Sequence, residues 1–381
     1  MIYELHKNGM EAVLQFYFPK KYTCREIVDI LRFWVIEYHV DGFHVIGERI
    51  PVEDIVKDPV LTETKIWFSD FNENELFDEK RKESGIKNIA VCNDRYLYDM
   101  RRFLKGDGQM MNSVIYQMRN IPKHIGKINY LSYYNGFTLL DNFSYDYKHN
   151  EDNGENNQDG TDYNCSWNCG AEGYTRKKKV NLIRKMLYKN AVCLLMLSAS
   201  TPMIFMGDEF GNSQKGNNNP YCQDNEITWL NWKDLERNKE LNSFTKQMIQ
   251  FRKEHRIIRP SKEHMVMDYK GYGYPDVSYH GTSAWKPQLD SNSRQLGIMF
   301  CEKYAEAKSD ESMNGFIYAG INMHWVNHDL ALPRLPKGQE WRLYIDTAEE
   351  YINTDGKMCT IPPRSISIFV AKNINANVKQ K

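Results

Sequence analysis

The sequence predicts an α/β fold in which a parallel sheet covered by helices precedes an all-β part. In the first 71 residues, segments of helical and strand character alternate, which is typical of parallel strands joined by helices. Beyond Pro260, short apolar runs alternate with turns rich in Gly, Pro and Asn, which is typical of β structure. We therefore expect two parts, residues 1–262 and residues 263–381.

The first segments are bounded by residues typical of helix ends. Gly9 is a candidate C-cap, because glycine adopts the left-handed conformation without strain. Thr23 is a candidate N-cap, and Glu26 three residues later completes a capping box. The expected helices lie over 2–8 and 25–40, and the expected strands lie within 11–18, 41–50 and 64–71.

Two long polar loops interrupt the later chain. Residues 146–173 and 213–229 are rich in Asn, Asp, Gly and Glu, and a loop of this length inside a folded domain is usually functional or disordered. Around these loops we expect a helix over 176–197, a buried strand and turn within 201–211, and a last clear helix over 244–256.

Composition and charge exclude several classes of protein. Lys plus Arg and Asp plus Glu both number 50, so the formal charge is zero, which argues against nucleic-acid binding through a basic surface. The hydrophobic share of 41% and the aromatic share of 13% exclude global disorder. No stretch approaches the length of a membrane span, and the first residues lack the pattern of a signal peptide. We therefore expect no membrane partner and a cytoplasmic location.

The eight cysteines are scattered along the chain, with one close pair, Cys165 and Cys169. A structural zinc site needs a second pair at short spacing, and the sequence has none. We expect reduced thiols, no metal and no cofactor.

Several motifs together resemble one enzyme family. They are VDGF (40–43), NDRY (93–96), RRFLKGD (101–107), NGFTLLD (135–141), the two polar loops with TPMIFMGDEFG before the second, and HGTSAWKP, NMHW and PPRSI near the end. The chain resembles the isoamylase and bacterial glycogen-debranching branch of the α-amylase superfamily, glycoside hydrolase family 13. The resemblance implies an incomplete (β/α)₈ TIM-type barrel, from the helix before strand 3 onward, followed by a C-terminal β-sandwich. It also implies retaining hydrolysis of α-1,6 branch points by two carboxyl groups about 5–5.5 Å apart.

The positions that align with the family's catalytic carboxylates are changed. Ile46 stands in place of the nucleophile, and isoleucine has no lone pair with which to form a glycosyl-enzyme ester. Ser69 stands in place of the proton donor, and a serine hydroxyl is too weak an acid for that step at neutral pH. Asn135 replaces the third carboxylate. No residue is therefore a confident catalytic candidate, and we expect an inactive protein.

Neighbouring polar positions of the family motifs are changed too. The arginine of the nucleophile motif is His44, and the histidine paired with the third carboxylate is Tyr134. The Asp, Asn and His of the family's first region are Gln15, Pro19 and Lys20. The resemblance therefore retains scaffold residues and loses polar residues of all four catalytic regions.

One pair of displaced carboxylates remains open as an alternative. Glu48 lies two residues past Ile46, so on a strand it would share the same face. Asp70 follows Ser69, and a slip of one residue in the alignment brings it into the donor position. A weakly active α-1,6-glucan hydrolase that uses Glu48 and Asp70 is thus a second hypothesis, against the simpler interpretation that both are surface loop residues.

The first hypothesis for function is a catalytically inactive debranching homologue that binds an α-glucan such as glycogen or starch. Its candidate binding residues are Tyr134, Asn135, Asn156, Trp167, Gln223 and Asp224. The alternative for the two polar loops is a structural role, held by Asx turns and hydrogen bonds. Further hypotheses are a structural or regulatory partner of an active debranching enzyme and a decaying gene product.

The resemblance leaves out the first two strands of the family barrel. A sheet that lacks them has an exposed edge, which favours pairing or aggregation. The chain is then a fragment of a longer protein, or a dimer or a partner covers the edge, or rearranged helices cover it. We favour a fragment narrowly over a dimer or partner.

Overall fold

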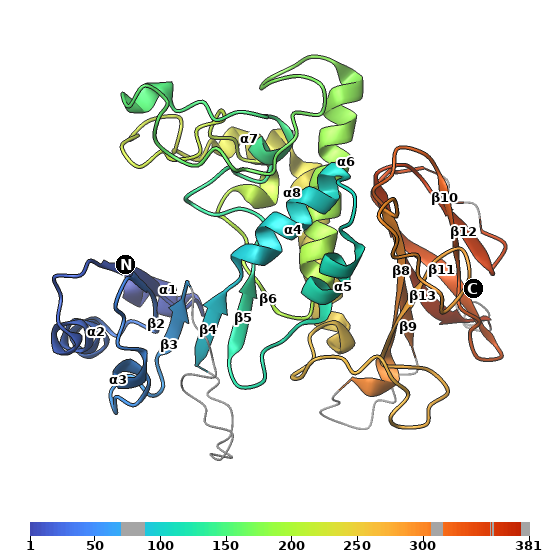
Figure 1. Cartoon of the computed structure of the whole chain (residues 1–381), viewed down its shortest axis with the longest axis horizontal. Coiled ribbons are helices and arrows are strands. Elements are labelled where there is room, and N and C mark those ends of the chain that lie inside the picture. The colour runs from blue at the N-terminus through green and yellow to red at the C-terminus, as the bar shows by residue number, and fades with distance from the viewer. Residues whose placement is uncertain (70–87, 306–314, 351, 353, 375–381) are drawn as a thin grey trace. The chain divides into compact units, whose positions relative to one another are not determined.

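The computed structural model describes residues 1–69, 88–305, 315–350, 352 and 354–374 of the 381-residue chain. The chain divides into two compact units (Figure 1). The first unit contains residues 1–94 and 121–129, and the second contains residues 95–120 and 130–381.

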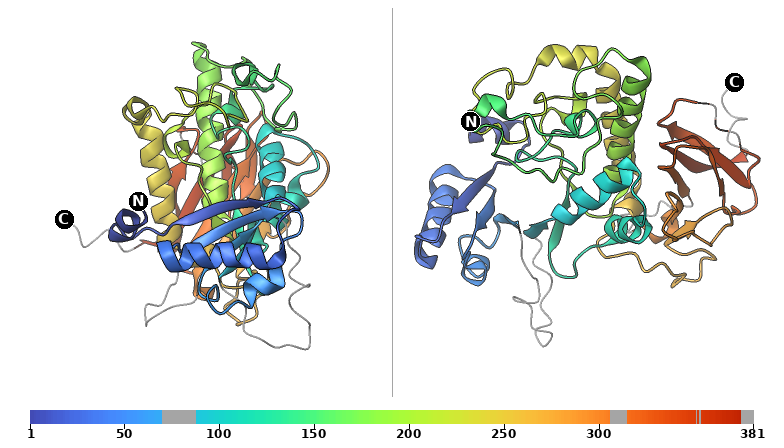
Figure 2. Two further views of the ribbon diagram at one scale, coloured as in Figure 1. Left: turned by 90° about the vertical axis from the view of Figure 1, so that its left-hand side faces the viewer. Right: turned by 45° about the horizontal axis from the view of Figure 1, so that its top comes forward.

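The first unit is built on parallel strands that pair in chain order (Figures 1 and 2). The described strands of this unit are β1 (Val13–Phe18), β2 (Gly42–Gly47), β3 (Lys65–Phe68), β4 (Ile89–Cys92) and β5 (Gly126–Asn129). Its helices are α1 (Ile2–Lys7), α2 (Cys24–Tyr38) and α3 (Val52–Val56). The parallel pairing confirms the expected α/β class, and β1 is the terminal strand of this order.

Helix α2 begins where the sequence predicts. The Thr23 side chain accepts a hydrogen bond from the Glu26 amide at 3.3 Å, and the Glu26 carboxylate accepts one from the Thr23 amide at 2.8 Å. This reciprocal capping box satisfies two amides that the first turn leaves without an intrahelical partner. The helix then buries Ile27, Val28 and Leu31 against the apolar core of the sheet.

The second unit contains a group of helices that surround the buried half of α6 (Lys178–Leu197). From Leu187 to Leu197 every residue of α6 is buried, so this half of the helix is enclosed on all sides. The other helices are α4 (Asp94–Lys105), whose first residue belongs to the first unit, α5 (Met111–Arg119), α7 (Trp232–Arg237) and α8 (Lys239–Glu254). Short 3₁₀ turns cover Asp141–Phe143, Glu151–Asn153, Asp208–Phe210, Arg256–Ile258 and Glu302–Tyr304.

Two helices confirm sequence predictions and one strand does not. The helices expected over 176–197 and 244–256 are α6 and α8, although α8 begins five residues earlier than expected. The buried strand expected within 201–211 is wrong, because β6 covers only Thr201–Pro202 and its residues are not buried. The apolar residues after β6 instead continue as partly exposed loop toward the turn that buries Asp208.

Beyond the 3₁₀ turn at 256–258, the regular elements that the structure describes are strands and one further 3₁₀ turn, so the prediction of β structure is confirmed. The strands are β7 (Val277–His280), β8 (Gln295–Cys301), β9 (Phe316–Asn322), β10 (His328–Ala331), β11 (Gln339–Asp346), β12 (Met358–Ile361) and β13 (Ser365–Asn373). Five form an antiparallel sheet in the order β11-β13-β9-β8-β7, and β10 pairs with β12. The boundary near residue 262 stays a prediction.

All eight cysteines are free thiols, including Cys165 and Cys169. Among the residues that the structure describes, no His, Cys, Asp and Glu side chains gather in groups of three or more that could hold a metal ion. None of the described helices combines the length and the apolar character that crossing a membrane requires.

Candidate functional site

A polar network in the first unit occupies three positions that align with the family's catalytic regions. Gln15 and His44 are register partners on β1 and β2, and Ser69 directly follows β3. The ring of His44 lies between the other two side chains: Nδ1 is 3.1 Å from the Gln15 Oε1, and Nε2 is 3.1 Å from the Ser69 Oγ. Cys92, the last residue of β4, places its Sγ 3.7 Å from the same Nε2. The network therefore joins four neighbouring strands.

This network is uncharged at neutral pH. His44 is 6% exposed, and burial lowers the pKa of its ring, against the opposing field of Asp94. The Gln15 oxygen accepts the proton of Nδ1, so Nε2 accepts the hydroxyl proton of Ser69. Burial also raises the pKa of the Cys92 thiol to about 12, which keeps the thiol protonated. An amide, an imidazole, a hydroxyl and a thiol thus stand together without a formal charge.

Ile46 lies on β2, two residues beyond His44, and pairs in register with Tyr17. The strand thus carries a half-buried hydrocarbon side chain at the position aligned with the nucleophile. At the position aligned with the proton donor, Ser69 is bound to a neutral imidazole. Neither group can form a glycosyl ester or protonate a leaving oxygen as a carboxyl group does.

The predicted carboxylate pair is only partly within the described residues. Strand β2 ends at Gly47, so the expectation that Glu48 shares a strand face with Ile46 is wrong. Glu48 lies in the bend after β2, where the side chain is exposed and forms an ion pair with Lys20. Asp70 lies outside the described residues, so the pair itself stays a prediction.

In the second unit, Tyr134 and Asn135 lie in the loop after β5, and both are exposed. The Tyr134 ring is 44% exposed and packs on Tyr133 with ring centroids 4.3 Å apart. The exposed part of a tyrosine ring offers an apolar surface to a sugar ring.

The two polar loops of the second unit bind one another through asparagine side chains. The Asn150 amide nitrogen donates to Asn218 Oδ1 at 2.9 Å, and the Asn218 backbone amide donates back to Asn150 Oδ1 at 3.0 Å. Asn217 donates to Asn153 Oδ1 at 2.8 Å. These pairs join segments more than sixty residues apart in sequence, and they give the Asn-rich stretches a structural role.

The other predicted glucan-binding residues differ in how available they are. Gln223 donates to the Asp152 carbonyl at 2.8 Å and to Asn153 Oδ1 at 2.9 Å, so its amide is engaged between the loops. Asp224 is exposed and accepts a hydrogen bond from Trp229 Nε1 at 2.9 Å. The partly buried Trp167 ring has the Arg364 guanidinium 4.3 Å from its centroid. Asn156 is exposed at a left-handed φ of 51°.

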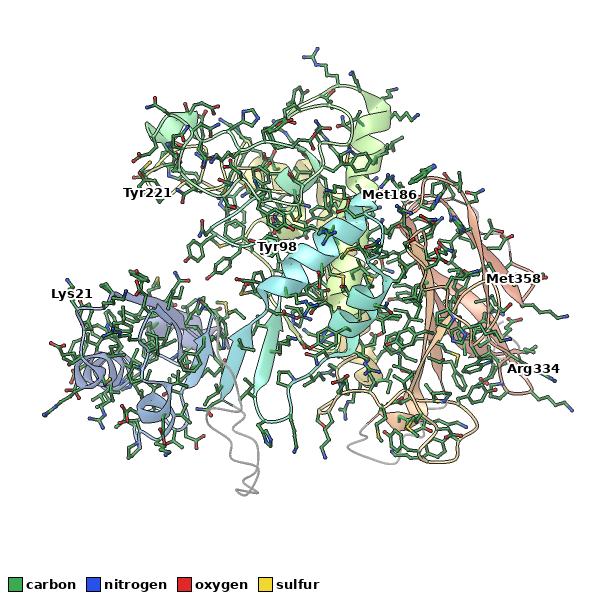
Figure 3. The ribbon with its side chains drawn as sticks, viewed as in Figure 1. Lys21, Tyr98, Met186, Tyr221, Arg334 and Met358 are labelled. Carbon is green, nitrogen blue, oxygen red and sulfur yellow. The ribbon has the colours of Figure 1, made fainter. Side chains whose placement is uncertain are left out.

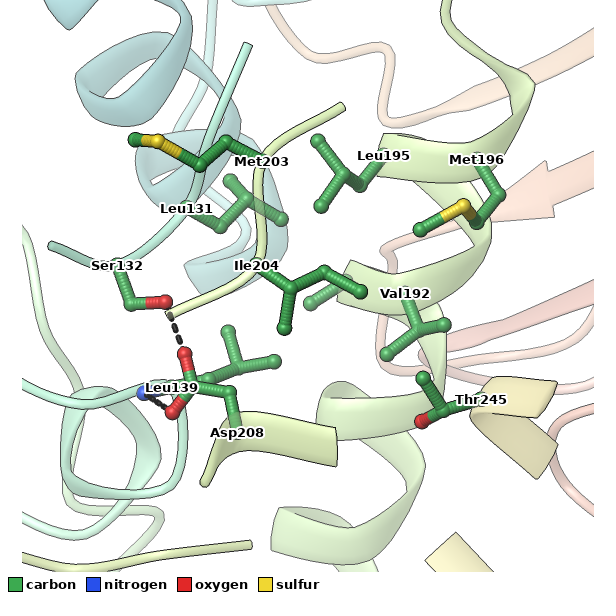
Figure 4. Close-up of a pocket in the computed structure, with 11 residues that line it drawn as sticks. Leu131, Ser132, Leu139, Val192, Leu195, Met196, Met203, Ile204, Asp208 and Thr245 are labelled. Carbon is green, nitrogen blue, oxygen red and sulfur yellow. Dashed lines mark hydrogen bonds between the residues drawn. The ribbon is translucent and has the colours of Figure 1, made fainter. Parts of the chain in front are cut away.

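Two buried carboxylates of the second unit were not predicted as site residues. Asp208 accepts a hydrogen bond from the Ser132 hydroxyl and one from the Leu139 amide at 2.9 Å, beside a cavity of about 20 Å³ (Figure 4). Burial raises the pKa of Asp208 to about 7 and that of Asp141 to about 6. The signal available in the sequence was the acidic pair of GDEFG, but nothing in that pattern separates the buried Asp208 from its partly exposed neighbour Glu209.

No protein-family model matches the chain. Curated relatives do match, and their names agree. The glycogen operon protein GlgX homologue of Mycobacterium tuberculosis is 35% identical over 260 residues, which cover 62% of this chain and 36% of the relative. Isoamylase 3 of Oryza sativa is 33% identical over 351 residues, which cover 86% of this chain and 42% of the relative. The glycogen debranching enzyme of Pectobacterium atrosepticum is 34% identical over 355 residues, which cover 83% of this chain and 50% of the relative.

The resemblance to the isoamylase and glycogen-debranching branch of the α-amylase superfamily is confirmed. The chain spans between about a third and a half of the length of these relatives of the isoamylase branch.

Solved structures of a pullulanase and of a glycogen-degrading protein share the fold of this chain. The pullulanase of Paenibacillus barengoltzii superposes with a TM-score of 0.68 at 14% identity, over 97% of this chain and 59% of that one. The glycogen-degrading pneumococcal virulence factor SpuA superposes with a TM-score of 0.67 at 12% identity, over 97% and 45%. At such identities the match concerns the fold alone.

Proposed function

We propose that this chain is a non-hydrolytic α-glucan-binding protein of glycogen or starch metabolism, with an incomplete (β/α)₈ barrel and a C-terminal β-sandwich. The observation that carries the proposal is the uncharged network of Gln15, His44 and Ser69, where the family resemblance places catalytic groups. The names of the relatives, which include isoamylase and glycogen debranching enzyme, support the metabolic setting. The free cysteines support a reducing compartment such as the cytoplasm.

Inactivity follows from the chemistry of retaining glycosidases. Such enzymes need one carboxylate to attack the anomeric carbon and one carboxylic acid to protonate the leaving oxygen, about 5–5.5 Å apart. Loss of one catalytic group lowers turnover by about 10⁴-fold or more, and losses within one catalytic unit leave only the residual rate of binding and positioning. With Ile46 and Ser69 at the two positions, we expect no measurable hydrolysis.

Glucan binding is supported by aromatic side chains exposed on the second unit. Beside Tyr134, exposed rings lie on the two polar loops and near them: Tyr147, Tyr163, Tyr174, Tyr221 and Trp229. Tyr221, labelled in Figure 3, is 66% exposed and donates to Glu155 of the other loop at 3.2 Å. Because the asparagine pairs hold both loops, these rings are presented with little conformational freedom left to lose on binding.

The test combines electrophoretic retardation in gels that contain glycogen with reducing-end release from glycogen and pullulan. We expect retardation without hydrolysis, and weaker retardation for Tyr134→Ala. Tyr3→Ala is the matched control, because Tyr3 is 74% exposed on α1 of the first unit. Hydrolysis that survives repurification and is abolished in Glu48→Gln, but not in Glu53→Gln, would refute the proposal in favour of displaced carboxylates. Unretarded migration of the wild-type chain would refute glucan binding.

A second candidate function, a partner-dependent subunit, is favoured by the apolar surface of the first unit. Tyr17 on the terminal strand β1 is 62% exposed, and Phe33, Ile36 and Tyr38 on α2 are about half exposed. An edge strand beside apolar side chains favours strand addition. We propose a second copy of the chain or an active debranching enzyme as the partner. Light scattering after size-exclusion chromatography should then show a dimer that Tyr17→Lys dissociates, or copurification with such an enzyme that Tyr17→Lys abolishes.

A further inference from the structure

A group of basic side chains in the second unit has no role in the function proposed above. Arg294 precedes β8, His324 follows β9, His328 begins β10, and Arg364 lies between β12 and β13. The backbone amide of Arg364 donates to the His324 carbonyl at 2.9 Å, which ties two of these segments together. We call Arg294, His324, His328 and Arg364 the basic cluster.

The two guanidinium groups of the basic cluster converge on one point of the backbone. Arg294 Nε donates to the Gly106 carbonyl at 2.6 Å, and Arg364 Nη1 donates to the Lys105 carbonyl at 3.1 Å. A β-carbon built on Gly106 would lie only 3.4 Å from Arg364 Nη1. Both cations therefore lie at the end of α4, where the carbonyl oxygens attract positive charge.

No acidic side chain compensates the two arginines within the described part of the chain. Neither guanidinium forms an ion pair there, and Asp107, next to Gly106, is paired instead with Arg102 and Lys105. Aromatic faces lie against the cations: the Arg364 guanidinium is 4.3 Å from the Trp167 ring, and that of Arg294 is 5.4 Å from the Trp325 ring. Such contacts stabilise a cation by about 0.5–2 kcal/mol and leave its charge in place.

The two histidines add ring nitrogens that the described residues leave without a partner. His324 Nδ1 and His328 Nε2 are buried and have no hydrogen-bond partner among those residues. Their rings lie 4.8 Å apart. Burial, followed by the fields of His328, Arg294 and Arg364, lowers the pKa of His324. A buried polar atom without a partner is rare in a native fold and calls for a missing ligand or water.

Trp325 adjoins this positive region as a rigid and exposed ring. One face of its indole stacks on His324 with ring centroids 4.1 Å apart and an interplanar angle of 28°. Its side chain is nevertheless 59% exposed. The Arg294 guanidinium also lies 5.4 Å from the indole centroid, so two neighbours hold a ring that is largely exposed. The exposed part of such an indole is suited to contact the apolar face of a sugar ring.

We propose that Arg294, His324 and Arg364 bind the phosphate group of a phosphorylated sugar, whose ring contacts the exposed part of the Trp325 side chain. Guanidinium groups bind phosphate through paired, charge-assisted hydrogen bonds, and His324 adds a further donor when its neutral ring carries the proton on Nδ1. The anion supplies the negative charge that the cluster lacks. The site is separate from the residues tested for glucan binding, so either proposal can fail without the other.

The experiment is isothermal titration of the full chain with glucose 6-phosphate, glucose, inorganic phosphate and AMP. We expect glucose 6-phosphate to bind, glucose not to bind, and inorganic phosphate and AMP to bind more weakly than glucose 6-phosphate. Arg294→Gln should weaken glucose 6-phosphate binding by about tenfold or more, the usual effect of losing a hydrogen bond to a charged group. Arg294→Lys should have a smaller effect, because it keeps the charge.

Two further variants keep the test decisive if a cluster arginine is needed for folding. Trp325→Ala changes an exposed ring, and it should weaken glucose 6-phosphate binding about fivefold while leaving inorganic phosphate unaffected. Arg342→Gln, an exposed arginine on β11, is the control and should change nothing. Absence of phosphate-dependent binding to the wild type, or equal effects of Arg342→Gln and Arg294→Gln, would overturn the site. Tighter binding of AMP than of glucose 6-phosphate would refute the proposal that the ligand is a phosphorylated sugar.

Discussion

At the scale of single residues, Asp208 is a carboxylate whose charge the fold disfavours. The side chain is 2% exposed, and burial raises its pKa from 3.8 to about 7 despite donors from Ser132 and Leu139. The folded chain therefore keeps a proton on Asp208 that the unfolded chain has lost above about pH 4. The free energy of unfolding then falls as pH rises from about 4 to about 7.

Asp208→Asn should remove this pH dependence, because an amide accepts from Leu139 and does not ionise. We expect the variant to be more stable than the wild type above pH 7 by roughly 1–4 kcal/mol, since each pKa unit corresponds to about 1.4 kcal/mol. Denaturant unfolding at pH 5 and pH 8 measures the difference. Asp54→Asn, an exposed change on α3, is the control. An equal pH dependence in wild type and variant would contradict the prediction.

At the scale of elements, the start of α2 depends on the Thr23 cap. Thr23→Ala leaves the Glu26 amide without its acceptor and should lower the free energy of unfolding by about 1 kcal/mol. Arg25→Ala in the same turn should change stability much less, because Arg25 is exposed and its ion pair with Asp29 is long, at 3.6 Å. Urea denaturation of the two variants compares them, and equal losses would argue against the cap.

The turn after α6 is stabilised by the buried side chain of Arg252 on α8. Its guanidinium donates to the carbonyls of Met196, Ser198, Ala199 and Ser200 at 2.5–3.3 Å. Arg252→Met leaves these oxygens buried without donors, and we expect a loss of about 3–5 kcal/mol. Lys253→Met, on the exposed side of α8, is the matched control and should be nearly neutral. Thermal unfolding followed by circular dichroism distinguishes the two.

At the scale of the whole molecule, Lys189 connects the helices of the second unit to its C-terminal part. The ammonium group of α6 is 3% exposed and contacts Glu240 of α8 at 2.5 Å and Glu349 beyond β11. Burial opposes ionisation of Glu240, but the hydrogen bonds from Lys185 and Lys189 hold the pKa of this carboxyl at about 2. The stabilisation is present above the ordinary value of 4.5 and is lost as pH falls from about 4.5 to about 2.

Lys189→Met should therefore destabilise the chain at pH 7 by about 1–2 kcal/mol, because two carboxylates lose a shared donor. The variant should also lose less stability than the wild type between pH 5 and pH 3. Melting temperatures across this range measure both effects, with the exposed Lys179→Met as the control. A parallel pH dependence in the two proteins would show that the ion cluster does not act in this way.

What the sequence by itself determined is local or positional. The capping box at Thr23, the alternation of helices with strands and the strand-rich C-terminal part each follow from residues close together in the chain. The predicted replacement of the nucleophile by Ile46 and of the proton donor by Ser69 likewise rests on motifs a few residues long. Helices α4, α5 and α7 were not predicted from the sequence, although α4 and α5 bury apolar faces that are typical of helices.

The tertiary structure decided what depends on residues far apart in sequence. The end of β2 places Glu48 outside the strand, and the fold brings His44 between Gln15 and Ser69. It also determines that Asp208 is buried while Glu209 is not. Burial, pKa shifts and long-range hydrogen bonds depend on which segments pack together, and hydrophobic patterns along one segment do not contain that information.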